Sequence, residues 1–139
     1  MLRSGSINTG TRLLSVIANI EALDVDIILS GHLDVVGAKK ELFTPRMVDD
    51  WLYGRGAMDM KSGCAAMIEA FKKVAGESDQ TMALLLTTDE EIGGFSGTKE
   101  LLDTAGYRAK VALVPDGGYK ENQIALKEKG VIRIHLSLE

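Results

Sequence analysis

The stretch at residues 81–94, TMALLLTTDEEIGG, joins a continuous apolar run directly to a group of carboxylates. The apolar part, residues 82–86, has the length and aliphatic content of a buried strand. Asp89, Glu90 and Glu91 follow where this strand would end. Like charges repel strongly in a partly desolvated place, so this arrangement raises the question of what compensates the three acids.

The composition bounds the class of protein. The chain has 139 residues, of which 45% are hydrophobic and 26% are charged, which is typical of one globular domain. The 20 acidic and 16 basic residues give a net charge of −4, and there is no basic run, so a nucleic-acid partner is not expected. No stretch is long enough to span a bilayer, so we expect no membrane association. The single cysteine, Cys64, favours a reducing compartment, and we expect a cytoplasmic location.

Several stretches have strand patterns bounded by turn residues. These are residues 13–20 (LLSVIANI), 25–29 (VDIIL), 82–86 (MALLL), 110–114 (KVALV) and 130–139 (GVIRIHLSLE). The first is the expected hairpin neighbour of the second. Pro115 ends the fourth.

Two helices are expected between the strands. Apolar residues recur at helical spacing at Met60, Cys64, Met67, Ile68, Phe71 and Val74. Gly76 is the expected C-cap of this helix. A shorter helix is expected at residues 98–105, with Ser96 as its N-cap and Gly106 closing it. Alternating strands and helices predict an α/β fold with a sheet that is at least partly parallel.

The ends of the predicted strands carry the same chemistry. Residues 25–29 lead to His32 and Asp34, residues 82–86 lead to the three acids, and residues 110–114 lead to Asp116. Asp59 stands at the start of the long helix. Ligands of such sheets sit beyond the carboxyl ends of the strands. One imidazole with several carboxylates suits zinc, cobalt or manganese better than a thiolate-built structural site, and Asp59 is well placed to bridge two ions.

Each of these residues also has an ordinary structural explanation. His32 alone is more often a satisfied core or surface histidine than a ligand, and Asp59 alone could be a helix N-cap. The acidic run could be a solvated loop or helix start, and Asp116 before two glycines is good turn chemistry. The repetition of the same residue types at every strand end is what favours a metal site.

The successive motifs LSGHLDVV, LYGRGAMDMKSG, TTDEEIGG and VPDGG, in this order over residues 28–118, resemble those of a metallohydrolase family. This is the aminoacylase, carboxypeptidase G and succinyl-diaminopimelate desuccinylase family of dinuclear metallopeptidases. The resemblance implies a three-layer α/β/α zinc-exopeptidase-like catalytic domain with a mixed, mostly parallel sheet. It also implies hydrolysis of a peptide or N-acyl amide bond in a small substrate, of the dipeptidase or amino-acid deacylase type.

Carried over by position, the resemblance implies a role for each candidate residue. The metal ligands would be His32, Asp59 (bridging), Glu91 and Asp116. Glu90 would be the general base, and Asp34 would orient the His32 ring. The cofactors implied are two divalent metal ions, zinc above all, with cobalt or manganese as alternatives. Many family members have Glu where this chain has Asp116, which leans towards the dipeptidases.

The chain also departs from the family pattern. The family's second metal takes a histidine from a downstream motif, whereas this chain has only His32 and His135. We therefore expect an incomplete second metal site and a chain that is weak or inactive on its own. We expect residues 1–129 to be a catalytic domain truncated at both ends, residues 130–139 to begin a missing lid (dimerisation) domain, and the uncovered surface to favour homo-oligomers. The alternative is a non-catalytic metal-binding or oligomerisation module. A weaker one is a structural domain with a solvated acidic rim.

Overall fold

The computed structural model describes residues 3–9, 12–18, 22–117 and 124–126. In chain order the elements, with η marking short helical turns, are β1 (Arg3–Thr9), β2 (Arg12–Ala18), β3 (Asp24–His32), η1 (Lys40–Phe43), β4 (Arg46–Val48), β5 (Trp51–Tyr53), η2 (Ala57–Lys61), α1 (Ser62–Val74), β6 (Met82–Thr87), η3 (Glu90–Ile92), η4 (Glu100–Thr104) and β7 (Arg108–Leu113). The expected strand at residues 130–139, with the proposed domain boundary there, lies outside the described residues. In the described part of the chain, no helix has both the length and the apolar character needed to cross a membrane.

The main sheet has five strands in the order β1-β2-β6-β3-β7. β3 pairs in parallel with both β6 and β7, while β2 pairs antiparallel with β6 and with β1. The sheet is therefore mixed, and its parallel half contains the three strands that lead to candidate site residues. The expectation that residues 13–20 form a hairpin with β3 is wrong, because β6 lies between β2 and β3.

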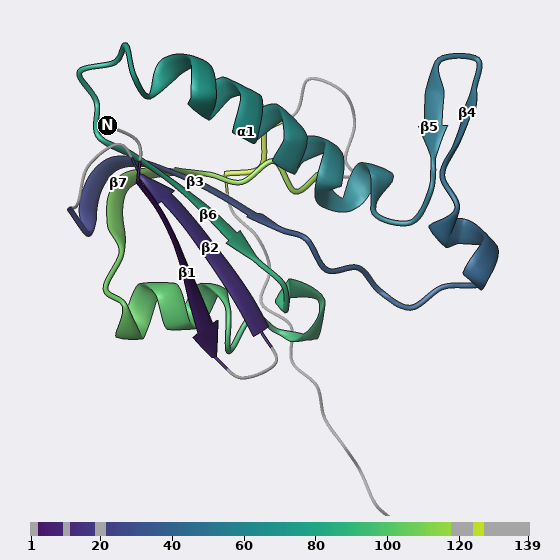
Figure 1. The fold of residues 1–139 in the computed structure, drawn as a ribbon, viewed down its shortest axis with the longest axis horizontal. Coiled ribbons are helices and arrows are strands. Elements are labelled where there is room, and N and C mark those ends of the chain that lie inside the picture. Colours follow the sequence, from purple (N-terminus) through teal and green to yellow (C-terminus); the bar gives the residue numbers. More distant parts are fainter. Residues whose placement is uncertain (1–2, 10–11, 19–21, 118–123, 127–139) are drawn as a thin grey trace, which may run out of the picture.

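Helices cover both faces of the sheet, as Figure 1 shows for α1 on one side and the helical turn η4 on the other. Cys64, Met67 and Phe71 of α1 pack with Leu29 of β3 and Leu84 of β6 in one buried cluster. The opposite cluster joins Leu101 of η4 to residues of the same strands: Val25, Ile28, Ala83 and Leu85. This confirms the predicted α/β fold. The central strand β6 is buried along its whole length, which explains why its sequence is a continuous apolar run.

The long helix begins and ends differently from the prediction. α1 starts at Ser62, because Asp59 has an extended backbone (φ −109°, ψ 103°) inside the irregular turn η2. Its C-cap is Ala75, not Gly76. The last carbonyls are satisfied without a glycine in the left-handed region, since the amides of Glu77 and Ser78 both donate to the Val74 carbonyl. Met60, Cys64 and Met67 are buried as predicted, whereas Val74 is 43% exposed.

The second helix begins at Thr98, as predicted: residues 98 and 99 are helical and run directly into the turn η4, and Lys99 has helical angles (φ −61°, ψ −43°). The residue directly before this helix is Gly97, one position after the expected N-cap Ser96. The prediction for its end is confirmed: Gly106 has a φ of +85°, and the amide of Tyr107 donates to the Leu101 carbonyl.

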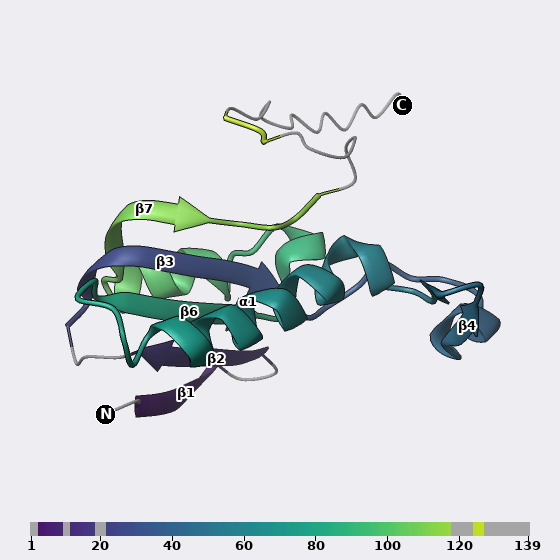
Figure 2. The same cartoon turned by 90° about the horizontal axis from the view of Figure 1, so that it is seen from above.

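A second, two-stranded sheet pairs β4 with β5, and neither strand was predicted. Figure 2 shows this hairpin extending away from the main sheet. Its strands are exposed throughout, and the Arg46 guanidinium stacks 5.6 Å from the centre of the Tyr53 ring. Three-residue strands without a buried face leave too little periodicity to be found in a sequence.

Candidate metal centre

The carboxyl ends of the three parallel strands lie at the same edge of the sheet. β3 ends at His32, β6 ends at Thr87 two residues before the acidic run, and β7 ends at Leu113, three residues before Asp116. Parallel pairing aligns these ends, with His32 opposite Thr87 in the register of β3 and β6. The structure thus brings together the side chains that the sequence placed at separate strand ends.

His32 is the centre of the cluster and is only 2% exposed. Its Nε2 lies 3.1 Å from Asp59 Oδ1, 3.7 Å from Asp116 Oδ2 and 3.9 Å from Glu90 Oε2. Its backbone is held from α1 and η2, since the Cys64 thiol donates to the His32 carbonyl at 3.3 Å and the His32 amide lies 3.3 Å from Met60 Sδ. The imidazole is therefore fixed, with one nitrogen facing a group of carboxylates.

The other ring nitrogen of His32 faces Asp34. Nδ1 lies 3.1 Å from the Asp34 carbonyl oxygen and 3.4 Å from Asp34 Oδ1. Both groups accept hydrogen bonds, so they favour a proton on Nδ1 and leave Nε2 for a ligand. This is the geometry expected of a residue that orients the ring.

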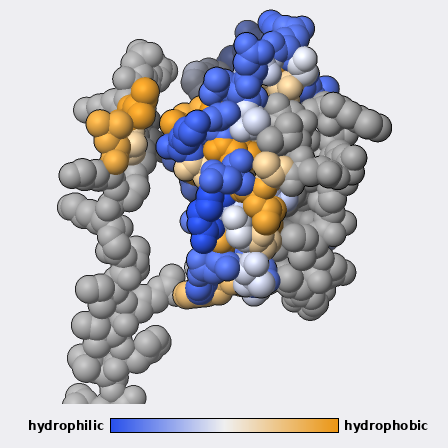
Figure 3. Space-filling model, turned by 90° about the vertical axis from the view of Figure 1, so that its left-hand side faces the viewer, coloured by the Kyte–Doolittle hydropathy of each residue, from blue (hydrophilic) through white to orange (hydrophobic). Residues whose placement is uncertain are grey.

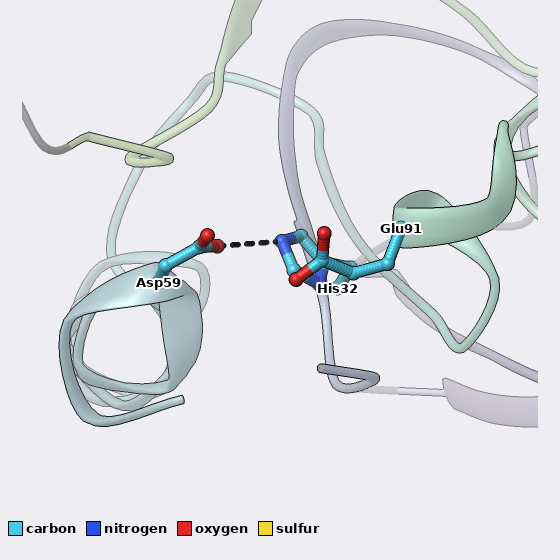
Figure 4. A group of neighbouring side chains, drawn as sticks. All are labelled: His32, Asp59 and Glu91. Atoms are coloured by element: carbon cyan, nitrogen blue, oxygen red, sulfur yellow. Dashed lines mark hydrogen bonds and ion pairs between the residues drawn. The ribbon is translucent and has the colours of Figure 1, made fainter. Parts of the chain in front are cut away.

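Asp59 projects from the irregular turn before α1, with half of its side chain exposed. The N-cap of α1 is Lys61, so Asp59 is not the cap that its position suggested. Its extended backbone carries the carboxylate towards His32, and Figure 4 shows Asp59 and Glu91 reaching His32 from different elements.

Glu90 and Glu91 stand on the turn η3, which Asp34 holds in place. The Asp34 carboxylate accepts the amide of Glu90 at 3.2 Å and that of Glu91 at 3.1 Å. Glu91 Oε1 in turn accepts the amide of Val36 at 3.2 Å. The sequence reasoning missed these contacts, because they join segments more than 50 residues apart and nothing in either segment indicates the other.

Two overlapping groups of side chains have the donor chemistry of a metal site. In each of them the ligand atoms lie within 4.8 Å of one another: one group is His32, Asp59 and Glu91, and the other is His32, Glu90 and Asp116. Imidazole nitrogen with carboxylate oxygen suits zinc, cobalt or manganese. Because the groups share His32, the described residues offer one imidazole to the whole cluster.

The charges of the cluster affect one another. Burial lowers the affinity of His32 for a proton, but the Asp34 carbonyl and the charge of Glu90 outweigh burial, and its pKa is raised. Burial also raises the pKa of Glu90; the charge of His32 opposes this rise and that of Asp116 adds to it. A bound cation would stabilise the ionised form of these crowded carboxylates.

A cleft of about 330 Å³ opens beside the cluster. His32, Glu90 and Asp116 line it together with the glycine-rich segment that follows η3, represented by Gly93 and Gly94. Its size fits a small ligand.

Comparison with known proteins agrees with these features. The family model described as Peptidase family M20/M25/M40 matches residues 28–136. Succinyl-diaminopimelate desuccinylase of Wolinella succinogenes is 43% identical over 95 residues, which cover 63% of this chain and 26% of that protein. The enzyme of the same name from Sulfurimonas denitrificans is 41% identical over 91 residues, covering 63% of this chain and 24% of that protein.

Among solved structures, human carnosine dipeptidase 1 superposes with a TM-score of 0.62 at 23% identity, covering 84% of this chain and 29% of that one. This likeness concerns the fold. The chain spans about a quarter of the length of the relatives that it matches.

Proposed function

The chain belongs to Peptidase family M20/M25/M40, and from this premise we propose that it carries the metal-binding core for hydrolysing a peptide or N-acyl amide bond in a small substrate. The observation that supports this most is the convergence of one buried imidazole and carboxylates from three strand ends on one edge of the sheet. We assign His32, Asp59, Glu91 and Asp116 as metal ligands. A divalent ion held there would polarise the substrate carbonyl and make water acidic enough to attack at neutral pH.

The other residues act on protons and positions. We assign Glu90 as the general base, because it lines the cleft and its carboxylate lies beside the candidate ligands, 3.9 Å from His32 Nε2. Glu90 would take a proton from the attacking water and later give it to the leaving amine. Asp34 would keep the His32 proton on Nδ1 and hold the backbone of Glu90 and Glu91.

The substrate class is proposed from the relatives and the cleft. The relatives are named for removing a succinyl group from an amino acid and for cleaving a dipeptide, both small amide substrates. A cleft of about 330 Å³ accommodates molecules of that size. We propose low turnover for this chain by itself, because the described residues give the cluster only one imidazole.

The test is a titration of the chain with Zn²⁺ or Mn²⁺ by calorimetry, followed by assays on a dipeptide and an N-acyl amino acid. We expect at least one ion per chain and a loss of binding in His32→Ala, with Asp79→Ala, an exposed aspartate, as the control. Metal binding without any turnover would favour the alternative function, a non-catalytic metal-binding module. Equal metal content in His32→Ala, Asp59→Ala and the parent would favour a structural domain with an acidic rim.

A further inference from the structure

Asp89 differs from its two acidic neighbours in its surroundings. It is 2% exposed, whereas half of the Glu90 side chain is exposed towards the cleft. Asp89 belongs to neither of the candidate metal groups among the described residues. The carboxylate thus points into the protein at the position where the chain leaves β6 and enters the turn η3.

The oxygens of Asp89 accept hydrogen bonds from the segment that follows the turn η3. Its Oδ2 accepts the amide of Ser96 at 2.8 Å, and its backbone carbonyl accepts the amide of Gly94 at 2.8 Å. Asp89 therefore accepts hydrogen bonds from two backbone amides, those of the residues five and seven positions further along the chain.

The second carboxylate oxygen is packed against Gly97. A Cβ atom at Gly97 would lie 1.9 Å from Asp89 Oδ1, so only glycine permits this approach. Oδ1 is buried and has no hydrogen-bond partner among the described residues. A buried carboxylate with an unpaired oxygen destabilises a fold, so stability alone does not account for an acid at this position.

The segment that is hydrogen-bonded to Asp89 forms part of the cleft wall. Gly93, Gly94 and Thr98 line the cleft together with the candidate site residues His32, Glu90 and Asp116. Gly93 and Gly94 have φ values of +109° and +66°, and neither has a side chain that could anchor it. The shape of this wall, and the direction in which Glu90 and Glu91 leave the turn, therefore depend on the contacts from Asp89.

We propose that Asp89 is a positioning residue of the centre: its buried carboxylate holds the Ser96 amide and packs against Gly97, and so connects the segment after the turn to the end of β6 and sets the geometry of the Glu90–Glu91 turn and of the cleft wall. Asp34 holds the same turn from the side of β3. The role of Asp89 in catalysis rests on the proposed function, whereas its contacts with the segment after the turn do not.

The first test needs no metal. Amide hydrogen exchange of the full chain is measured by NMR in Asp89→Ala, in Asp89→Asn and in the control Asp79→Ala. We expect exchange at Ser96 to rise about tenfold or more in Asp89→Ala, with α1 unchanged, because its hydrogen bond to a charged acceptor is lost. Exchange at Gly94 should rise less, because its amide donates to the Asp89 backbone carbonyl, which the substitution keeps. Asp89→Asn keeps an acceptor for Ser96 and should show a much smaller rise. Unchanged exchange at both amides, or an equal rise throughout α1, would mean that the residue serves the fold as a whole and would overturn the proposal.

The second test is Zn²⁺ affinity at a temperature where all variants are folded. We expect the dissociation constant for Zn²⁺ to rise about tenfold to a hundredfold in Asp89→Ala, which is the usual effect of losing a residue that orients metal ligands. Asp89→Asn should restore part of the affinity. Gly97→Ala should weaken binding in the same way, because its Cβ atom would displace the carboxylate although Asp89 is still present. Equal affinity in the parent and Asp89→Ala would overturn the inference and leave the proposed function standing. A parent chain that binds no Zn²⁺ would refute the proposed function, while the exchange experiment would still decide on Asp89.

Discussion

Glu90 and Glu91 are neighbours in the chain, yet their side chains have different surroundings. Glu91 Oε1 accepts the Val36 amide, so its carboxylate is held at the rim near Asp59. Glu90 has its carboxylate 3.9 Å from His32 Nε2 and lines the cleft. A held carboxylate suits a metal ligand, and one that faces the substrate space suits a base.

At this scale the first prediction concerns Glu90→Gln. The amide keeps the size of the side chain but cannot take up a proton, so kcat should fall by about 10²- to 10⁴-fold while Zn²⁺ content stays at the parent level. Turnover and bound metal are measured on the same samples. Glu69→Gln, on the exposed side of α1, is the matched control and should keep both values. Undiminished turnover in Glu90→Gln would show that another group moves the proton.

That the candidate ligands lie together could be predicted from the sequence, but the contacts that support them could not, and their role as ligands stays a prediction. His32, Asp59 and Asp116 are visible because each follows an apolar run or opens a helix, and the topology of a parallel sheet brings such positions together. The bonds from Asp34 to the amides of Glu90 and Glu91 carry no local signal, since backbone donors are present at every residue. The supporting contacts depend on three-dimensional register that the pattern of residue types does not contain.

Among the elements, α1 and the segment after β7 approach each other at Gly63. A Cβ atom there would lie 2.5 Å from the Pro115 carbonyl oxygen and 3.0 Å from Pro115 Cγ. Pro115 precedes Asp116, so the close approach of helix and strand end sets the distance from Asp116 to His32. The helix can only lie this near because residue 63 has no side chain.

We therefore predict that Gly63→Ala destabilises the chain and weakens metal binding. Overpacking against a backbone atom costs about 1–3 kcal/mol, which exceeds the gain of up to about 1 kcal/mol from alanine in a helix. Urea unfolding and Zn²⁺ titration measure the two effects. Gly76→Ala is the matched control, since nothing lies within 4 Å of a Cβ atom there. If Gly63→Ala is as stable as the parent, the contact with Pro115 is not tight.

A second contact between elements joins β3, β7 and the start of β6. The Asp26 carboxylate accepts hydrogen bonds from Lys110 Nζ at 2.6 Å, from the Thr81 amide at 2.9 Å and from Thr81 Oγ1 at 2.8 Å. The Lys110 bond, followed by those from Thr81, lowers the pKa of Asp26 from 3.8 to about 2.

This shift predicts a pH dependence. Because the pKa is lower in the folded chain, the stabilisation is fully present above the unfolded value of 3.8 and is lost as the pH falls towards about 2. In Asp26→Asn this part of the acid dependence should be absent. The measurement is the urea midpoint as a function of pH, with Asp79→Asn as control. Parallel pH curves for the parent and Asp26→Asn would contradict it.

Helices and strands with a strong apolar periodicity were predicted correctly. The order of the strands, which depends on how they pair, was not. β6 and the body of α1 follow directly from their apolar patterns. The position of β2 beside β6 could not be inferred, because strand order depends on long-range pairing and not on the strand's own residues. The start of α1 was misplaced since the irregular turn at Asp59 has the same apolar spacing as the helix it precedes.

For the molecule as a whole, two of the groups of exposed apolar residues lie on strands. One is the hairpin β4–β5, with Trp51 68% and Leu52 54% exposed. The other is β7, the edge strand of the described sheet, where Val111 is 50% and Leu113 is 52% exposed. On the face seen in Figure 3, hydrophilic residues are more common than hydrophobic ones among the residues that are coloured.

An apolar edge strand is a template for pairing with another chain, so the last prediction is that copies of this chain associate through β7. An antiparallel pair of β7 strands centred on Val111 would place Ala109 opposite Leu113 and Lys110 opposite Ala112, so no like charges would meet. Val111→Lys should weaken association by about tenfold or more, because it puts two lysines face to face at the centre. Sedimentation over a range of concentrations measures this. Val74→Lys, the same change at a 43% exposed position on α1, should associate like the parent. A parent chain that stays monomeric at every concentration, or equal weakening by both variants, would exclude pairing through β7.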